Sequence, residues 1–299
     1  VVVDSINGVD VTTGTTVNVG AGSIMRVSGY VKDAPQFNGV LAASVHDSRE
    51  LITCLWNNRN EDEAASSPFT YYDRPKVLFN GNDSIVGGRF EFSFAVPKDI
   101  NYTDGTGLIN LYALSNDRTL IGNGYCESFI VGGGDVAEND SVGPSIYCYL
   151  NSPSFVNGGN VNSTPYFVAE IMDKDGINSS GNGIGHDLQL VIDGEMARTY
   201  NLNDNFSYDF GSYTRGTTYY NIPELEEGEH TLQFRAWDVF NNMSSTQLRF
   251  KVVKGLTPSL FSVSCTNNPA TTSTTFIISH DRAGSTVDVG IDVFDMSGR

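Results

Sequence analysis

The sequence predicts an all-β protein built from tandem β-sandwich domains. Short alternating apolar runs recur along the chain with turn signals between them, as in sandwiches and barrels. Gly accounts for 31 of the 299 residues, and Thr, Ser, Asn and Val are abundant, which favours strands and turns. Charged residues make up only 18% of the chain, fewer than is typical of helical proteins. We therefore expect almost no helix, with at most a short turn near residues 97–102.

Residues 1–134 are predicted to form the first β-sandwich domain. The clearest strand covers residues 89–96, RFEFSFAV, where Phe90, Phe92 and Phe94 share one face and Arg89 and Glu91 the other. A polar stretch at 57–68 has no periodicity and is predicted to be a loop. Further strands are predicted over residues 23–31, 39–46, 51–56, 107–115 and 124–131.

Residues 135–254 are predicted to form a second, immunoglobulin-like or fibronectin-like β-sandwich, entered through a Gly-rich acidic linker at 132–144. Its final two strands, 230–237 and 246–253, face each other across FNNMSS as the last hairpin of such a fold. The Cys…Trp…Cys pattern of true immunoglobulin domains does not occur. Asp193–Gly194 is a strong hairpin-turn signal. Earlier strands are predicted over 146–150, 166–172, 188–193 and 218–222.

Residues 255–299 are predicted to begin a third β-sandwich, with strands over 274–279 and 287–294. About 45 residues are few for an independent core, so this part is expected to be truncated. Because strand-like runs stand at both ends of the chain, we expect the sequence to be a fragment of a longer protein.

The charge of the chain excludes some classes of partner. Eighteen Lys and Arg stand against 35 Asp and Glu, for a formal net charge of −17, so the chain repels nucleic acid. No apolar run approaches the roughly 20 residues that span a bilayer as a helix, and Val1–Val3 lacks the basic flank of a signal peptide. Acidic loops suit calcium, which prefers carboxylate and carbonyl oxygens.

The loop at 173–187, DKDGINSSGNGIGHD, is the best candidate for a metal site. Asp173, Asp175 and Asn178 offer oxygens in a D-x-D-G-x-N arrangement, and Gly176 allows a sharp bend. The full EF-hand pattern with its final Glu is absent, so Asx-turns alone are the alternative means of ordering this loop. No other cofactor is expected.

Other chemistry-bearing residues are assigned structural roles. His186 and Asp187 are expected to fix the long loop, and Trp237 and Asp238 to begin the turn before the last strand. Three further histidines lie on or beside separate strands and are also interpreted as structural. Free thiols on strands are favoured over two disulfides, for which three pairings exist, because no CxxC pair or dense framework occurs. The cysteines are Cys54, Cys126, Cys148 and Cys265.

Three stretches carry a resemblance to a known family. They are FNGVLAASVHD with IVGGRFEFSFAVPKDINY (37–47, 85–102), DKDGINSSGNGIGHDLQLVIDG with EGEHTLQFRAWDVFNN (173–194, 227–242), and the tail at 267–299. In order and spacing they resemble the C-terminal region of the PorU family, the cell-surface sortases of type IX secretion in Bacteroidetes, which are related to the gingipain cysteine peptidases. The tail resembles the start of a type IX C-terminal signal domain.

This resemblance implies a non-catalytic region. In that family the catalytic Cys and His lie in an upstream peptidase domain that nothing here matches, so no catalytic residue is assigned. The implied role is to scaffold that peptidase domain at the cell surface and to dock through the tail onto PorV, an outer-membrane barrel. The alternative is a secreted adhesin or carbohydrate-binding β-sandwich, which an aromatic platform beside a calcium loop would favour.

Overall fold

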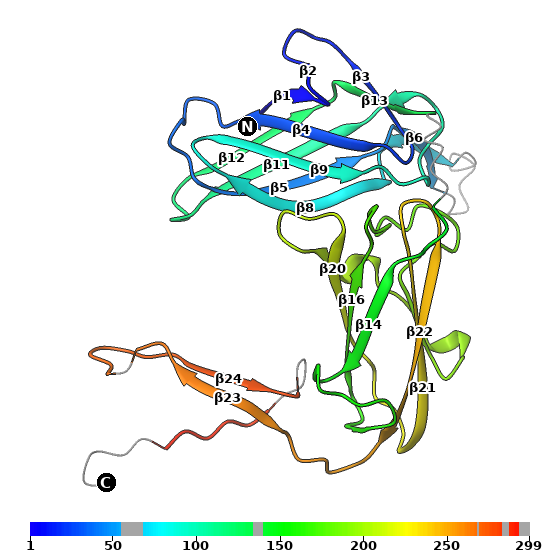
Figure 1. Ribbon diagram of the computed structural model, residues 1–299, viewed down its shortest axis with the longest axis vertical. Helices are drawn as coiled ribbons and strands as arrows, with labels where there is room; N and C mark the ends of the chain where they lie inside the picture. The colour runs from blue at the N-terminus through cyan, green and yellow to red at the C-terminus, as the bar shows by residue number, and fades with distance from the viewer. Residues whose placement is uncertain (55–67, 134–139, 268, 283–286, 293–299) are drawn as a thin grey trace, which may run out of the picture.

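The computed structural model describes residues 1–54, 68–133, 140–267, 269–282 and 287–292, and these residues form the predicted all-β architecture (Figure 1). They contain no α-helix, and the two 3-10 turns are η2 (Met196–Arg198) and η3 (Asn203–Asn205). Residues 97–102, where at most a short turn was expected, form an irregular connection that enters a turn at Tyr102. Among the described residues, no helix is long and apolar enough to cross a bilayer.

The N-terminal part of the chain folds into three sheets around one hydrophobic core. Their strand orders are β2-β1-β4-β9, β10-β13-β3 and β12-β11-β5-β8. The strands are β1 (Val2–Ile6), β2 (Val9–Asp10), β3 (Val17–Gly20), β4 (Ile24–Tyr30), β5 (Gly39–His46), β8 (Val77–Ile85), β9 (Arg89–Ala95), β10 (Gly105–Thr106), β11 (Leu108–Ser115), β12 (Ile121–Cys126) and β13 (Phe129–Gly132).

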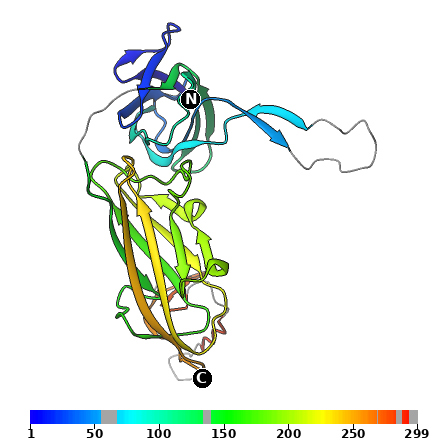
Figure 2. The same ribbon diagram turned by 90° about the vertical axis from the view of Figure 1, so that its right-hand side faces the viewer.

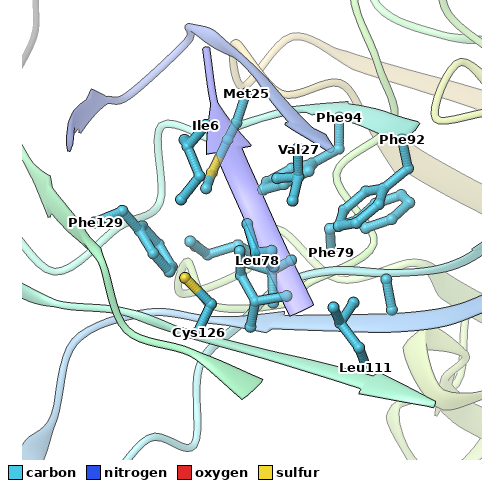
Figure 3. Close-up of a cluster of buried hydrophobic side chains, with 14 of the residues drawn as sticks. Ile6, Met25, Val27, Leu78, Phe79, Phe92, Phe94, Leu111, Cys126 and Phe129 are labelled. Atoms are coloured by element: carbon cyan, nitrogen blue, oxygen red, sulfur yellow. The ribbon is translucent and has the colours of Figure 1, made fainter. Parts of the chain in front are cut away.

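Alternation along β9 explains how this core is supplied. Phe90, Phe92 and Phe94 are buried, whereas Arg89 and Glu91 on the opposite face are exposed, as predicted. Figure 3 shows Phe92 and Phe94 beside Phe79 of β8, and the Phe79 and Phe94 rings stack with centroids 5.0 Å apart. Burying each such ring contributes roughly 1.5–3 kcal/mol.

The middle of the chain forms a two-sheet sandwich. One sheet has the order β14-β16-β20-β19 and the other β15-β22-β21-β17-β18. The strands are β14 (Ser145–Leu150), β15 (Asn160–Val161), β16 (Tyr166–Met172), β17 (Gln189–Ile192), β18 (Thr199–Asn201), β19 (Phe206–Tyr208), β20 (Arg215–Asn221), β21 (Gly228–Trp237) and β22 (Met243–Val252).

A second hydrophobic core lies between these two sheets. Alternate residues of β16 and β21 fill it, and the rings of Phe167 and Phe234 meet there with centroids 5.3 Å apart. The antiparallel hairpin of β21 and β22, in register from Gly228↔Val252 to Trp237↔Met243, confirms the predicted last hairpin. The two large cores draw on residues between Val3 and Val131 and between Cys148 and Val252. The domain boundaries at 134 and 254 themselves stay predictions.

Two hairpins stand apart from the cores. β6 (Glu50–Cys54) pairs with β7 (Phe69–Asp73), and Figure 2 shows this hairpin projecting sideways from the N-terminal part. β23 (Leu260–Cys265) pairs with β24 (Phe276–His280) near the C-terminus, where Figure 1 shows it beyond the sandwich.

Several predicted strands were wrong in extent. The single strand expected over 124–131 is two strands, β12 and β13, because the chain passes between them from one sheet to another. No strand was predicted over β8, whose NGND sequence resembles a turn but pairs with β5. Residues 287–292 of the expected strand 287–294 are not a strand, and 293–294 lie outside the described residues. The predicted loop at 57–67 and linker positions 134–139 also lie outside them.

Candidate functional site at the junction of the two cores

Segments from both cores meet at one junction, and they belong to the motifs that the sequence singled out. Residues 97–102, the loop 173–187 and the turn 237–242 are joined there by backbone hydrogen bonds. Lys98 donates its N–H to the carbonyl of Val239 (2.9 Å), and Val239 donates to the carbonyl of Gly176 (3.0 Å). Ile177 and Asp238 form an antiparallel bridge. The turn 237–242 is therefore bonded directly to the first half of the chain, and the long loop is bonded to that turn.

The carboxylate of Asp99 is the polar centre of this junction. Asn178 donates its amide to Oδ2 (2.9 Å), His186 Nδ1 lies 2.7 Å from the same oxygen, and Asn241 donates to Oδ1 (3.0 Å). A carboxylate accepts several such bonds at once, and charge-assisted bonds are stronger than neutral ones. One side chain of the first core thus binds two separate loops of the second.

A second carboxylate, which is fully buried, holds the segment that carries Asp99. Asp47, the last residue of the FNGVLAASVHD motif, is fully buried and accepts the N–H of Asn101 (2.6 Å) and that of Ser48 (2.6 Å). Ser48 also contacts the Thr103 hydroxyl (2.9 Å). Burial raises the pKa of Asp47, while these N–H donors act to lower it. The motif residue therefore positions the irregular connection after β9.

His186 and Trp237 close the outer side of the junction. Their rings lie 4.3 Å apart between centroids, at an interplanar angle of 41°. Arg235 donates to the carbonyl of Gly185 (3.2 Å), and Asn203 donates to Asp187 (2.9 Å). The long loop is thus held at its C-terminal end by β21 and η3.

An apolar seam lies beneath these polar contacts. Ala95, Val239 and Phe240 form a small buried cluster with Tyr213 packed against it. Gly176 lies against this seam with φ +126°, and an added Cβ would stand 3.1–3.3 Å from Ala95, Tyr213 and Val239. Only glycine satisfies both the backbone and the space at this position.

Tyr208 belongs to both large cores. Its ring lies 5.3 Å from that of Phe79, and its hydroxyl donates to the carbonyl of Ile177 (2.6 Å). Burial raises the pKa of Tyr208 to about 12. The hydroxyl therefore stays a hydrogen-bond donor across the physiological range.

The predicted metal ligands occupy the start of the loop, where turn bonds use their oxygens. Asp173 Oδ1 accepts the N–H groups of Asp175 (2.8 Å) and Gly176 (3.2 Å), and Asn178 Oδ1 accepts from Ser180 (2.6 Å from Oγ). The Lys174 ammonium lies 2.7 Å from Asp175 Oδ2. In the described residues no three His, Cys, Asp or Glu side chains converge to hold a metal ion. Lys174 therefore offsets part of the negative charge of this donor set.

Asp238 is fully buried and caps the turn that follows Trp237. It accepts N–H bonds from Phe240 (2.9 Å) and Asn242 (2.7 Å), and the Asn242 side chain adds a third (2.8 Å). The pKa of Asp238 is raised to about 6, chiefly by burial and also by the charge of Asp173, although the hydrogen-bond donors act to lower it. Burial also raises the pKa of Asp173. Two carboxyls therefore share a poorly solvated space under the junction.

The four cysteines are free thiols, as the sequence favoured. Cys126 and Cys148 are buried, whereas Cys54 and Cys265 are partly exposed. Each of the four histidine rings is hydrogen-bonded to an oxygen atom or to a backbone N–H group. The pairs are His46 with Ser44 and Arg74, His186 with Asp99, His230 with Asp193 and Glu226, and His280 with Arg282.

The sequence did not identify Asp99, Asp47, Asn241 or Tyr208 as junction residues. Asp99 lies 79, 87 and 142 residues from its three partners, so no local spacing signals the contact. The one available signal was that Asp47 and Asp99 both fall inside the stretches that carried the family resemblance. The segments 37–47, 85–102, 173–194 and 227–242 of these stretches meet in space at this junction.

Comparison with known proteins identifies a related chain. No family model matches, and no curated protein is similar. Among solved structures, the chain is similar to the crystal structure of dimeric latent PorU from Porphyromonas gingivalis, with 35% sequence identity and a TM-score of 0.53. The match covers 99% of this chain and 28% of the PorU chain. The sequence thus corresponds to little more than a quarter of that relative.

Replacing Asp99 by alanine should loosen the junction selectively. The change leaves three donors without their acceptor, at a cost on the order of 3 kcal/mol in total. Amide hydrogen exchange of residues 173–187 and 237–242 should accelerate, while the β21–β22 hairpin stays protected. Exposed Asp204, replaced by alanine, is the matched control and should leave exchange unchanged. Wild-type exchange in Asp99→Ala would show that the carboxylate does not hold the loops.

The raised pKa of Asp238 predicts a pH dependence of stability. Since the folded-state pKa (about 6) lies above the ordinary 3.8, the folded chain holds a proton that the unfolded chain releases. This carboxyl should therefore lower the unfolding free energy by roughly 3 kcal/mol as pH rises from about 4 to 6. Asp173→Asn keeps the turn acceptor but removes the neighbouring charge, so the decline in urea-unfolding free energy should become smaller. An unchanged decline in Asp173→Asn, equal to that of an Asp204→Asn control, would contradict this coupling.

Calcium binding by Asp173, Asp175 and Asn178 stays a prediction of the sequence, and a melting experiment decides it. A bound ion stabilises the folded state in proportion to the logarithm of its concentration over Kd, so millimolar calcium should raise the Tm above that in EDTA. Asp175→Asn should abolish the rise, and Asp204→Asn should not. Equal melting temperatures in calcium and in EDTA would leave the Asx-turns as the means of ordering the loop.

Proposed function

Because the chain is a PorU-related β-region, we propose that it is a non-catalytic scaffold of a larger cell-surface protein of type IX secretion. In this proposal it holds an upstream peptidase domain of the gingipain-like class and docks the whole to the outer-membrane complex. The observation that carries it is 35% identity to PorU across 99% of the chain. The peptidase activity belongs to the parent protein and not to these residues.

The junction supports the scaffolding role. A spacer that must hold a neighbouring domain in a set orientation needs its own halves fixed to each other. Here Asp99 binds two loops of the second core, and an apolar seam with Tyr208 lies beneath. Interfaces between domains of one chain move readily unless they are broad and apolar, so these specific contacts are what a rigid spacer requires.

The C-terminal hairpin supports the docking role. Both β23 and β24 expose large apolar side chains, among them Leu260, Val263 and Ile277. A groove of about 450 Å³ lies beside them, lined mainly by apolar residues that include Phe276 and Ile278. Exposed apolar patches of this kind mark sites of protein association. The proposed partner of this surface is PorV.

The scaffold proposal is tested with the purified 299-residue chain and PorV-containing outer-membrane vesicles. The chain should cleave no peptide in a mixed library, and vesicles with PorV should retain it more than vesicles without PorV. Val263→Ser with Ile277→Ser should weaken retention at least tenfold, because both side chains are exposed on the hairpin. Val86→Ser with Val156→Ser, at exposed valines elsewhere, is the matched control.

Peptidase activity from the isolated chain would overturn the scaffold role. Equal retention by the two kinds of vesicle would overturn docking through PorV.

A further inference from the structure

The outer face of the sheet β14-β16-β20-β19 carries a cluster of tyrosines that the junction does not use. Alternate residues of these strands point away from the second core. In register, Tyr149, Val168 and Tyr219 form one row across three strands, and Tyr147, Glu170 and Thr217 form the next. Tyr166 stands at the end of the same face. We name Tyr147, Tyr149, Tyr166 and Tyr219 the tyrosine platform.

The rings of the platform lie over the sheet. Val168 is on this outward face between Tyr149 and Tyr219, yet it is only 8% exposed, so the neighbouring rings must cover it. The Tyr166 and Tyr219 rings stack at 6.1 Å between centroids, and Tyr147 and Tyr149 lie 5.7 Å apart. Tyr147 and Tyr219 nevertheless stay 50% and 45% exposed. One side of the platform rests on the protein and the other faces solvent.

The platform is also held in position before any ligand arrives. The Tyr147 hydroxyl donates to the carbonyl of Pro153 (2.7 Å). All four tyrosines stand on paired strands, and tyrosine has only two side-chain torsions to fix. Rigid aromatic side chains on paired strands lose little conformational entropy on binding.

A shallow polar groove continues from the platform along the same face. It has a volume of about 350 Å³ and is lined by Tyr147, Glu170, Asp209, Arg215 and Thr217 among others. Arg215 Nε lies 3.3 Å from Asp209 Oδ2, and both side chains are exposed. Carboxylates, a guanidinium and a hydroxyl thus stand beside flat aromatic rings. This differs from an interface core between proteins, where charged residues are depleted.

We propose that the tyrosine platform and its groove bind a neutral oligosaccharide. The apolar C–H face of a pyranose packs on an aromatic ring, and its hydroxyls pair with charged side chains in two-pronged hydrogen bonds. The tyrosine rings of the platform offer the aromatic surface. The side chains of Glu170, Asp209 and Arg215 offer the hydrogen-bonding groups. Two carboxylates face one guanidinium here, and the whole chain carries −17, so an anionic ligand is repelled. This binding activity is separate from the scaffold role and does not depend on it.

The proposal is tested with the whole 299-residue chain and four neutral probes: cellohexaose, maltohexaose, xylohexaose and N-acetylchitohexaose. Titration calorimetry should detect saturable binding of at least one of them. Tyr149→Ala and Tyr219→Ala should each weaken it about tenfold or more, as expected for buried aromatic contacts. Tyr219→Phe keeps the ring and should retain most of the affinity. Tyr125→Ala removes an exposed tyrosine of β12, outside the platform, and should bind as wild type.

Further arms keep the result interpretable if an alanine variant folds poorly. Glu170→Gln preserves size and should weaken binding severalfold with an unchanged Tm, because a charge-assisted acceptor becomes neutral. Hexagalacturonate, an anionic probe, should bind more weakly than the neutral probes.

Three outcomes would overturn the proposal. They are the absence of saturable binding to any neutral probe, equal affinities in Tyr219→Ala and Tyr125→Ala, and light scattering in which the platform variants convert a dimer to a monomer without any glycan binding. The last outcome would assign this face to a second copy of the chain. None of these results bears on retention by PorV-containing vesicles.

Discussion

The charge of one carboxylate joins the two halves of this molecule. Asp99 stands on an irregular connection of the first core and accepts hydrogen bonds from an asparagine, a histidine and a second asparagine of the other core. Because this short side chain binds three donors at once, it fixes both the distance between the two cores and their relative orientation at this point. Gly176 allows the backbone conformation of one of the two loops that Asp99 binds, and Asp238 caps the turn in the other.

Burying the carboxyl groups beneath this contact costs free energy, and the hydrogen bonds around them reduce that cost. Asp47, Asp173 and Asp238 are buried carboxyls with raised pKa values, and each is surrounded by backbone N–H groups that stabilise its charge. Buried acidic side chains contribute little net stability, but their hydrogen bonds to backbone N–H groups hold an irregular segment in one conformation. This explains why the loops that sequence composition marks as unusual are also well-defined turns.

Strands with a regular alternation could be predicted from the sequence, and long-range contacts could not. Residues 39–46 and 166–172 were predicted from end to end, since a buried face on a strand leaves a period of two. β8 escaped prediction because Asn80, Gly81, Asn82 and Asp83 have the composition of a turn, and only pairing with β5 makes them a strand. The main hydrogen-bond acceptor of the loop 173–187 is Asp99, which lies far away in sequence. The packing of the two cores brings such a hydrogen-bond partner into place, so no local sequence pattern predicts it.

Tyr208 has a consequence for any attempt to dissect the chain. Its ring packs against both cores, and its hydroxyl reaches into the loop between β16 and β17. Cutting the chain at the connection between the cores would expose the Tyr208 ring of the C-terminal piece to solvent. It would also expose the apolar surface around Phe79 in the N-terminal piece. The two halves are therefore better regarded as one cooperative unit for expression and crystallisation than as separable modules.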